Sequence, residues 1–453
     1  MKQLLAYCLS IILCVSFTGC MENYLDLYPE DKITSASFPE NESDIKLLLN
    51  GVYAQLREKE VYNQGLFGFG ITDGATPNAF NWGTDEVFNK LGAGRLSSSD
   101  GGVVTYRWKR CYEIISRANY LLACMDLVDL SEEAKAKYSG ETHFLRGLAY
   151  SVLAETYGGV PIILTNISTE EARSLKRASL EETWQQALDD YEVAITNLGV
   201  DAPEPGRATK GAALGMKMRA YLYQGKYKEV LSCVEQIDAL KKYGLFHSYE
   251  GLFDPANENN KEVLFDIQYI EGENSQGSYI DQYCGTGTGS WTRGSRYVPT
   301  DDLVAAYETI DGSPVDPENP YENRDPRLGF TAVLPGSYFL GYRFPNYLYP
   351  GGAFNHAGNR LKHLSTRKYR IQDESKLPPS GQSYINDIIL RYADVLLSKA
   401  EAIIETNGSV ADAIAILNRI RTERDDVKIS LLPTSMSREE AREKVRHERR
   451  IEL

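Results

Sequence analysis

The sequence predicts a mainly α-helical protein, built from tetratricopeptide-like helical hairpins with long, irregular, loop-rich insertions. Apolar residues recur at spacings of three and four through residues 103–243 and 385–453, and short glycine-containing connections join the helices. Residues 60–102 and 254–384 are instead rich in Gly, Pro, Asn and Tyr. Long loops of this kind are uncommon in compact bodies and tend to be functional, so we expect them to form the ligand side.

The first residues of the chain indicate an export signal. Lys2 precedes an apolar run from Leu4 to Phe17, which at about fourteen residues is shorter than the roughly twenty that span a bilayer. Phe17-Thr18-Gly19-Cys20 resembles a bacterial lipobox. We therefore expect residues 1–19 to be removed and Cys20 to be lipidated, with an ordinary signal peptide and an incidental cysteine as the alternative.

Composition restricts the class of protein. The chain has 453 residues, is 42% hydrophobic and has a mean hydropathy of -0.37, which argues against both a multi-span membrane protein and a disordered chain. Lys and Arg number 49 against 63 Asp and Glu, and the net charge of -14 would repel a polyanion. We therefore expect no nucleic-acid partner.

Four cysteines remain after the leader: Cys111, Cys124, Cys233 and Cys284. Cys111 and Cys124 lie on one predicted helix, about 20 Å apart along its axis, which is too far for a disulfide. We expect them to be small core side chains. No CxxC pair, HExxH motif or zinc-type Cys/His spacing occurs, so no metal and no cofactor are predicted.

The helices of the first block follow one another closely. The periodic pattern starts near Val103, and a second helix begins after Ser131 and ends at Gly158-Gly159. Further helices are predicted over 180–198, 209–224 and 227–243. Gly225 with an aromatic residue two positions later is typical of a tetratricopeptide turn.

A second hairpin is predicted near the end of the chain. An apolar stripe runs from Leu390 to Ile404, Asn407-Gly408 forms the turn, and residues 411–421 return. In the first block, Trp108 and Trp184 lie on apolar helical stripes and are predicted to be core residues.

Two aromatic loop clusters have the composition of a sugar-binding site, which combines flat rings with polar groups for the hydroxyls. The first is Phe80-Asn81-Trp82 with Asp85, and the second is Tyr279, Tyr283, Trp291 and Arg293. The alternative is that Trp82 and Trp291 pack the loops against the body.

Other motifs resemble known phosphate-binding or catalytic signatures but are incomplete. The glycine-rich run 285–289 lacks the Gly-Lys-Ser/Thr of a phosphate loop and is expected to be a flexible loop. His447-Glu448-Arg449-Arg450 begins like a metalloprotease HExxH motif but lacks its second histidine, so a solvated, salt-bridged helix is predicted there. No local spacing singles out a catalytic carboxylate pair, so no enzymatic activity is predicted.

Eight landmarks, in order, resemble the SusD/RagB family of Bacteroidetes outer-membrane lipoproteins. They are the lipobox, residues 24–34, 49–53, 141–146 with 157–161, 207–212, 323–328, 391–397 and 448–453. Family members usually continue past the last landmark, so further residues after Leu453 are expected.

The resemblance implies a lipidated arm over 20–41 and a single body over 42–453. It also implies surface exposure on the outer membrane, capture of oligo- or polysaccharide, and delivery to a TonB-dependent, SusC-like barrel. Glu22 and Asp26 resemble the acidic export tags of surface lipoproteins. A peptide-binding or purely protein-interacting lid of such a transporter is the alternative.

Overall fold

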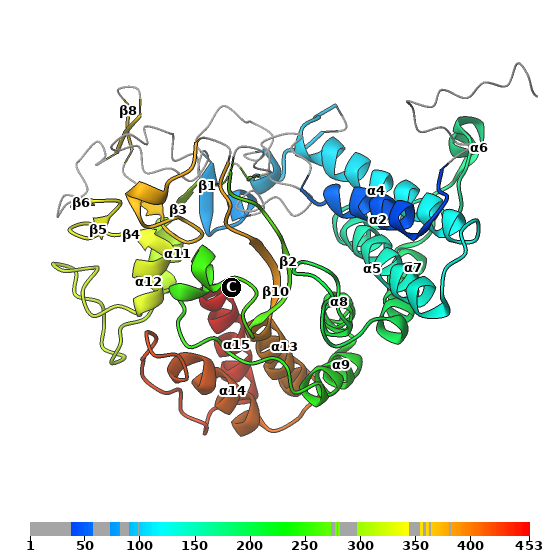
Figure 1. Ribbon diagram of the computed structural model, residues 1–453. Helices are drawn as coiled ribbons and strands as arrows, with labels where there is room; N and C mark the ends of the chain where they lie inside the picture. The colour runs from blue at the N-terminus through cyan, green and yellow to red at the C-terminus, as the bar shows by residue number, and fades with distance from the viewer. Residues whose placement is uncertain are drawn as a thin grey trace, which may run out of the picture.

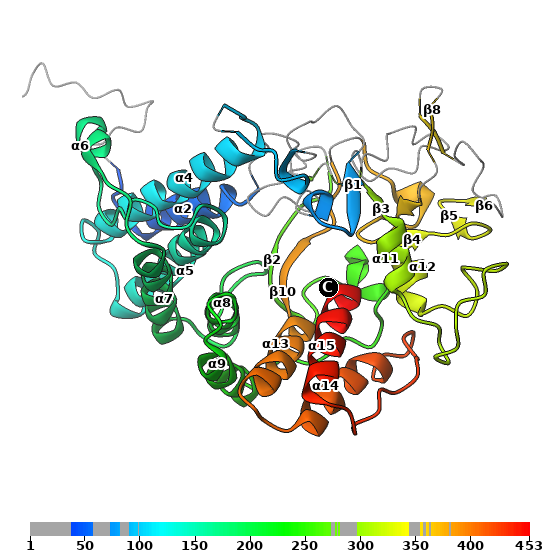
Figure 2. The same ribbon diagram turned by 180° about the vertical axis from the view of Figure 1, so that it is seen from behind.

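The computed structural model describes residues 38–57, 73–81, 90–97, 99–272, 277–278, 280, 297–343, 354–356, 359–361, 364–379 and 382–453. Helices dominate these residues (Figures 1 and 2). They are α2 (Glu42–Ala54), α4 (Val103–Met125), α5 (Glu132–Tyr157), α6 (Thr169–Ser174), α7 (Leu180–Asn197), α8 (Lys210–Tyr223), α9 (Tyr227–Ala239), α11 (Asp301–Ala306), α12 (Pro326–Thr331), α13 (Tyr392–Glu405), α14 (Val410–Thr422) and α15 (Arg438–Glu452). The predicted mainly α fold is confirmed.

The strands of the described residues form two-stranded antiparallel ladders. The pairs are β1 (Ala79–Asn81) with β3 (Tyr297–Pro299), β2 (Val263–Ile267) with β10 (Asp387–Arg391), β4 (Ala332–Val333) with β9 (Ser365–Thr366), β5 (Tyr338–Phe339) with β6 (Tyr342–Arg343), and β7 (Phe354–His356) with β8 (Asn359–Leu361). The region predicted as irregular therefore contains short strands. The pairs β1–β3, β2–β10 and β4–β9 join segments far apart in the chain, so their short strands leave no local pattern to recognise, whereas β5–β6 and β7–β8 are local hairpins of two or three residues a strand.

The predicted helix boundaries agree with the structure in most places. The Ser131 side chain accepts a hydrogen bond from the Ala134 amide and caps α5, and Gly158, with φ of 75°, ends that helix. The helix predicted over 227–243 is shorter, because α9 ends at Ala239. Lys241 takes a φ of 53°, which interrupts the helix, and the Tyr243 hydroxyl then lies 3.2 Å from that of Thr209.

The helices α4, α5, α7, α8 and α9 each pack against the next as antiparallel hairpins, and α9 packs on α13, which continues the stack through α14 and α15. Close approach of α5 and α7 depends on Gly147, where an added Cβ would lie 3.0 Å from the Asp190 Cβ and 3.1 Å from the Ala187 carbonyl oxygen. Gly225 in the turn between α8 and α9 has a φ of 69°, as a tetratricopeptide turn requires.

The main core lies between these helices and β2–β10. Trp184 is buried in it, and Trp108 is half-buried, with its ring against those of Tyr112 and Tyr157. Cys111 and Cys124 are buried, as predicted, Cys233 is also a buried free thiol, and Cys284 lies outside the described residues.

The β2–β10 ladder runs between the helical hairpins and the segments that contain the other strands (Figure 1). The apolar stripe predicted to start a helix at Leu390 instead begins in β10, because Leu390 pairs with Phe265 of β2. Among the described residues, no helix has both the length and the apolar character needed to cross a bilayer.

Candidate functional site

The β1–β3 ladder joins the two loop regions that the sequence singles out. Phe80 pairs with Val298 and Asn81 with Tyr297, although more than two hundred residues separate the strands. The first predicted cluster starts in β1, and the second ends at Arg293, four residues before β3. The ladder therefore places Ala79–Asn81, where the first cluster begins, beside Tyr297–Pro299, which follows the second cluster in the sequence (Figures 1 and 2).

Of the predicted ligand residues, the structure places Phe80 and the backbone of Asn81 in β1. The Phe80 ring is 45% exposed, so it can meet a ligand from solvent. The other predicted positions lie outside the described residues, and so does the predicted lipidation site: Trp82, Tyr279, Tyr283, Trp291, Arg293 and Cys20. Their roles remain predictions.

A cavity of about 280 Å³ lies against the ladder. Its lining comes from the ladder, from α8 and α13, from β10, from the segment around Lys368 and from the end of α15. The lining residues are Asp73, Asn78, Ala79, Arg219, Pro299, Leu303, Tyr307, Thr331, Thr366, Lys368, Tyr369, Ile388, Ile389, Arg391, Asp394, Arg450, Ile451 and Leu453.

The cavity presents both hydrogen-bond donors and acceptors. Lys368 Nζ donates to the Tyr249 hydroxyl at 3.1 Å and to the Leu453 carbonyl oxygen at 2.9 Å. Loss of solvent lowers the pKa of Lys368 to about 7, and the positive charge of Arg391 acts in the same direction. Asp73 and Thr366 add a carboxyl and a hydroxyl group to the lining. Such a mixture suits polyhydroxylated ligands better than apolar ones.

Asp394 on α13 is fixed at the edge of this cavity by two arginines. Arg219 approaches it to 2.6 Å and Arg449 to 2.7 Å. Burial acts to raise the pKa of Asp394, but the two guanidinium groups hold it well below its usual range. A carboxylate that stays ionised in this way is a poor proton donor, which gives no support to general acid chemistry here.

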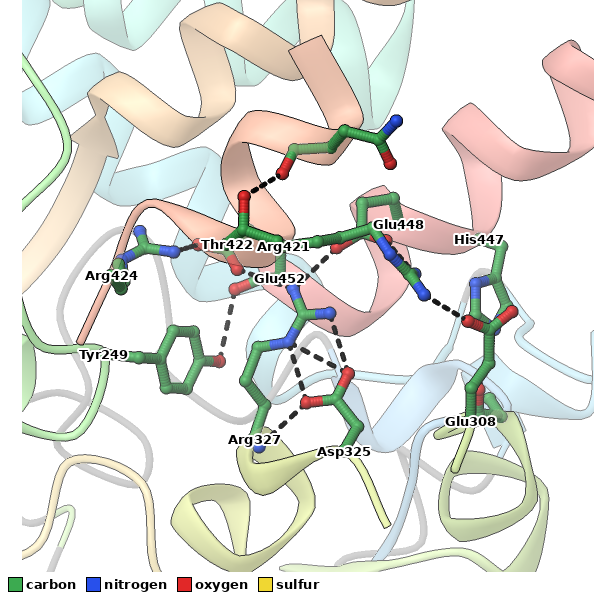
Figure 3. A network of polar contacts seen from close by, with 12 residues as sticks. Tyr249, Glu308, Asp325, Arg327, Arg421, Thr422, Arg424, His447, Glu448 and Glu452 are labelled. Atoms are coloured by element: carbon green, nitrogen blue, oxygen red, sulfur yellow. Dashed lines mark hydrogen bonds and ion pairs between the residues drawn. The ribbon is translucent and has the colours of Figure 1, made fainter. Parts of the chain in front are cut away.

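Next to the cavity, a buried salt-bridge network holds α15 in place (Figure 3). Arg327 pairs with Asp325 at 2.7 Å, Glu448 at 2.7 Å and Glu452 at 2.8 Å. Arg421 pairs with Glu448 at 2.9 Å. The members are buried from solvent and paired with one another, as buried charges require.

The same network extends to the β2–β10 ladder. Arg391 of β10 pairs with Glu452 at 2.6 Å and with Glu262, just before β2, at 3.0 Å. Arg424 pairs with Glu262 and Glu452, each at 2.8 Å. We call the set Glu262, Asp325, Arg327, Arg391, Arg421, Arg424, Glu448 and Glu452 the buried ionic cluster.

The predicted helix and salt bridges at 447–450 are confirmed, but the prediction that this helix is solvated is wrong for Glu448, which is 1% exposed, as is the neighbouring Glu452 at 0%. The sequence carried a signal that could have indicated this. Ala441, Val445, Glu448 and Glu452 are spaced by four, three and four residues, so the apolar stripe of α15 continues into two glutamates on the same face. A stripe that ends in acidic residues indicates buried arginine partners elsewhere in the chain.

The described residues include no group of three or more His, Cys, Asp or Glu side chains that could hold a metal ion. The site in this part of the chain is therefore an exposed ring on a short ladder, next to a polar cavity and a buried ionic cluster.

Comparison with known families covers most of the chain. Residues 23–222 match a family described as starch-binding associating with outer membrane, and residues 261–453 match the SusD family. The chain belongs to the SusD/RagB family. Three of the landmarks that resemble this family, 323–328, 391–397 and 448–453, supply members of the buried ionic cluster.

Relatives of this SusD-family protein match it over most of their length. SusD-like protein P25 of Formosa agariphila is 25% identical, over 100% of this chain and 87% of its own. A crystal structure of a SusD-like carbohydrate binding protein from Bacteroides fragilis is 28% identical, covers 91% of this chain and 83% of its own, and has a TM-score of 0.79. The crystal structure of another SusD-like protein from B. fragilis is 27% identical, covers 94% of this chain and 86% of its own, and has a TM-score of 0.80.

Proposed function

We propose that this SusD-family protein is a lipid-anchored protein of the cell surface that binds oligo- or polysaccharide and delivers it to a TonB-dependent outer-membrane barrel. It acts by binding, without a catalytic step. The observation that supports the proposal is the β1–β3 ladder, which carries the exposed Phe80 ring and lies beside a polar cavity. The similarity to a carbohydrate binding protein over 91% of the chain supports it.

The chemistry of the ladder suits sugars. An aromatic ring stacks on the C–H face of a pyranose, and the exposed Phe80 ring offers such a face. Trp82 follows β1 directly, and Trp291 precedes β3 by six residues, so their rings extend the same surface in this proposal. Polar groups of the cavity are available for hydroxyl groups at its edge.

Affinity electrophoresis in gels that contain starch, laminarin, xylan or pectin tests the site. Phe80→Ala, Trp82→Ala and Trp291→Ala are each expected to weaken binding of the retained polysaccharide about fivefold, since stacking on one ring is worth on the order of 1 kcal/mol. Tyr120→Ala on α4, where the ring is 40% exposed, is the matched control and should bind normally.

A second control separates binding from stability. Trp184 is buried in α7, so Trp184→Ala should lower the unfolding free energy by about 3–5 kcal/mol and leave affinity unchanged at low temperature. Loop variants that bind as tightly as the wild type but melt earlier would show that these rings pack the loops. The site would then have to be sought around Tyr338, whose side chain is 69% exposed.

A protein-interacting lid is the second candidate, and the stacked hairpins favour it. Helical hairpins of this type form large partner surfaces, and a stable complex needs roughly 1,000 Å² or more. Under our proposal the helical side contacts the barrel independently of ligand, so a TonB-dependent barrel should copurify in mild detergent with and without polysaccharide. If no barrel copurifies, the protein binds its ligand as a free-standing protein. If a barrel copurifies but the protein binds no glycan, a protein-interacting lid or a peptide-binding protein is favoured.

A further inference from the structure

The last turn of α15 contacts the predicted ligand ladder directly. Arg450 Nε donates a hydrogen bond of 2.7 Å to Oδ1 of Asn78, 372 positions earlier in the chain. Asn78 is the residue immediately before β1. A single contact therefore connects the most C-terminal helix of the described residues with the first strand of the ladder.

The backbone of Asn78 is also hydrogen-bonded to Thr300, the residue that follows β3. Its carbonyl oxygen accepts the Thr300 amide at 3.0 Å, and the Thr300 hydroxyl donates to the carbonyl oxygen of Pro77. Thr300 follows β3 and caps α11. A three-residue ladder has few hydrogen bonds of its own, so fixing Asn78 restrains both strands.

The helix end that carries Arg450 is held firmly. Glu448 and Glu452, on either side of Arg450, belong to the buried ionic cluster. Ile451 is 2% exposed and packs with Leu303 of α11, in the helix that follows β3. Arg450 thus extends from an anchored element to a short ladder whose Phe80 ring is exposed.

We propose that Arg450 is a positioning residue for ligand binding, because its Nε–H to Asn78 fixes the β1–β3 ladder against α15. This inference rests on the proposed function, since the ladder is taken as the glycan-binding element. In this role Arg450 acts through the N–H group at Nε, and the positive charge of its guanidinium group is not required.

Two substitutions of similar length separate these properties. The Gln Nε2 has the same number of bonds from Cα as the Arg Nε, so Arg450→Gln keeps a donor at the same place without the charge. Arg450→Met places a methyl carbon there. Arg450→Met is expected to weaken binding of the polysaccharide that retards the wild type about fivefold, the size of one lost hydrogen bond, while Arg450→Gln stays within about twofold.

Pairing with Asn78 gives a second test. Asn78→Ala should weaken binding as Arg450→Met does, and the double variant should bind no more weakly than either single variant, because both remove the same contact. Arg446→Met is the control on α15, where the exposed Arg446 pairs with Glu443 of its own helix at 2.9 Å; it should bind normally.

Hydrogen exchange of the ligand-free protein tests positioning directly. Peptides covering 73–81 and 297–303 should exchange several-fold faster in Arg450→Met than in the wild type or Arg450→Gln. Equal loss of affinity in the Met and Gln variants, or unchanged exchange in Arg450→Met, would overturn the inference. If the wild type binds no polysaccharide, the proposed function fails, and the exchange experiment alone still decides whether Arg450 fixes the ladder.

Discussion

Individual charged side chains in this protein have very different consequences according to their burial. Arg327 is fully buried, and its three acidic partners are buried with it. Removal of one partner from such a set leaves uncompensated charge in the interior, which costs far more than loss of a surface pair. Arg446, on the exposed side of α15, pairs with Glu443 in solvent. The two arginines form a natural comparison.

We expect Arg327→Ala to lower the unfolding free energy by about 3–5 kcal/mol, because Asp325, Glu448 and Glu452 lose their shared cation. Arg446→Ala should change it by no more than about 0.5 kcal/mol. Urea unfolding followed by circular dichroism measures both. Similar values for the two variants would mean that the buried ionic cluster does not stabilise the fold.

At the scale of elements, Asp266 of β2 and Asp387 of β10 are buried and the nearby Glu258 is half-buried, all without cationic partners among the described residues. Asp266 accepts a hydrogen bond from Asn386 Nδ2 at 3.2 Å, and Glu258 accepts the Asn386 amide at 2.8 Å. None of the ion pairs among the described residues involves Asp266, Asp387 or Glu258. Burial raises the pKa of Asp266 to about 6, and of Glu258 and Asp387 to about 7.

These shifts fix the sign of a pH dependence. The folded protein binds more protons than the unfolded chain between about pH 4 and 7, so the stability from these groups is present at the acidic end and is lost as pH rises. Each group contributes up to about 1.4 kcal/mol per pH unit. Asp387→Asn should therefore flatten the decline in unfolding free energy between about pH 4 and 7, as urea titrations would show.

The exposed Asp412 on α14 provides the control for this experiment. Asp412→Asn should leave the pH profile unchanged. A profile for Asp387→Asn that parallels the wild type would show that Asp387 ionises normally in the folded protein. The buried carboxyl groups would then make no contribution to the pH dependence.

At the scale of the whole molecule, the helical hairpins and the segments that carry the short ladders lie in different parts of the fold. The hairpins α4–α9 lie on one side and the short ladders on the other, with β2–β10 and α13–α15 between them (Figures 1 and 2). In the proposed function, the hairpins contact the barrel and the ladders bind the glycan. The predicted lipid at Cys20 would keep both at the membrane surface.

The anchor is testable by substitution. Fatty-acid labelling and detergent partitioning are expected for the wild type and should be lost in Cys20→Ala, since no acyl chain can be attached. Protease added to intact cells should digest the wild type if it is exposed. An unlabelled wild type with a mature N-terminus elsewhere would end the lipoprotein proposal.

The sequence by itself determined the local elements. Spacings of three and four, a serine cap at Ser131 and glycines at 158 and 225 act within a few residues, so α4, α5, α7 and α8 could be predicted to within a residue or two at most boundaries. The family was also recognisable from short landmarks, and both matches confirm it.

Only the tertiary structure decided which distant segments meet. The pairing of Phe80 with Val298, the burial of Glu448 and Glu452, and the contact of Arg450 with Asn78 all join residues more than one hundred positions apart. A charged residue in a sequence carries no mark of its partner, and a three-residue strand has no periodicity. Whether a glutamate faces water or a buried arginine depends on packing, because the cost of desolvation is offset only where the folded chain brings the opposite charge.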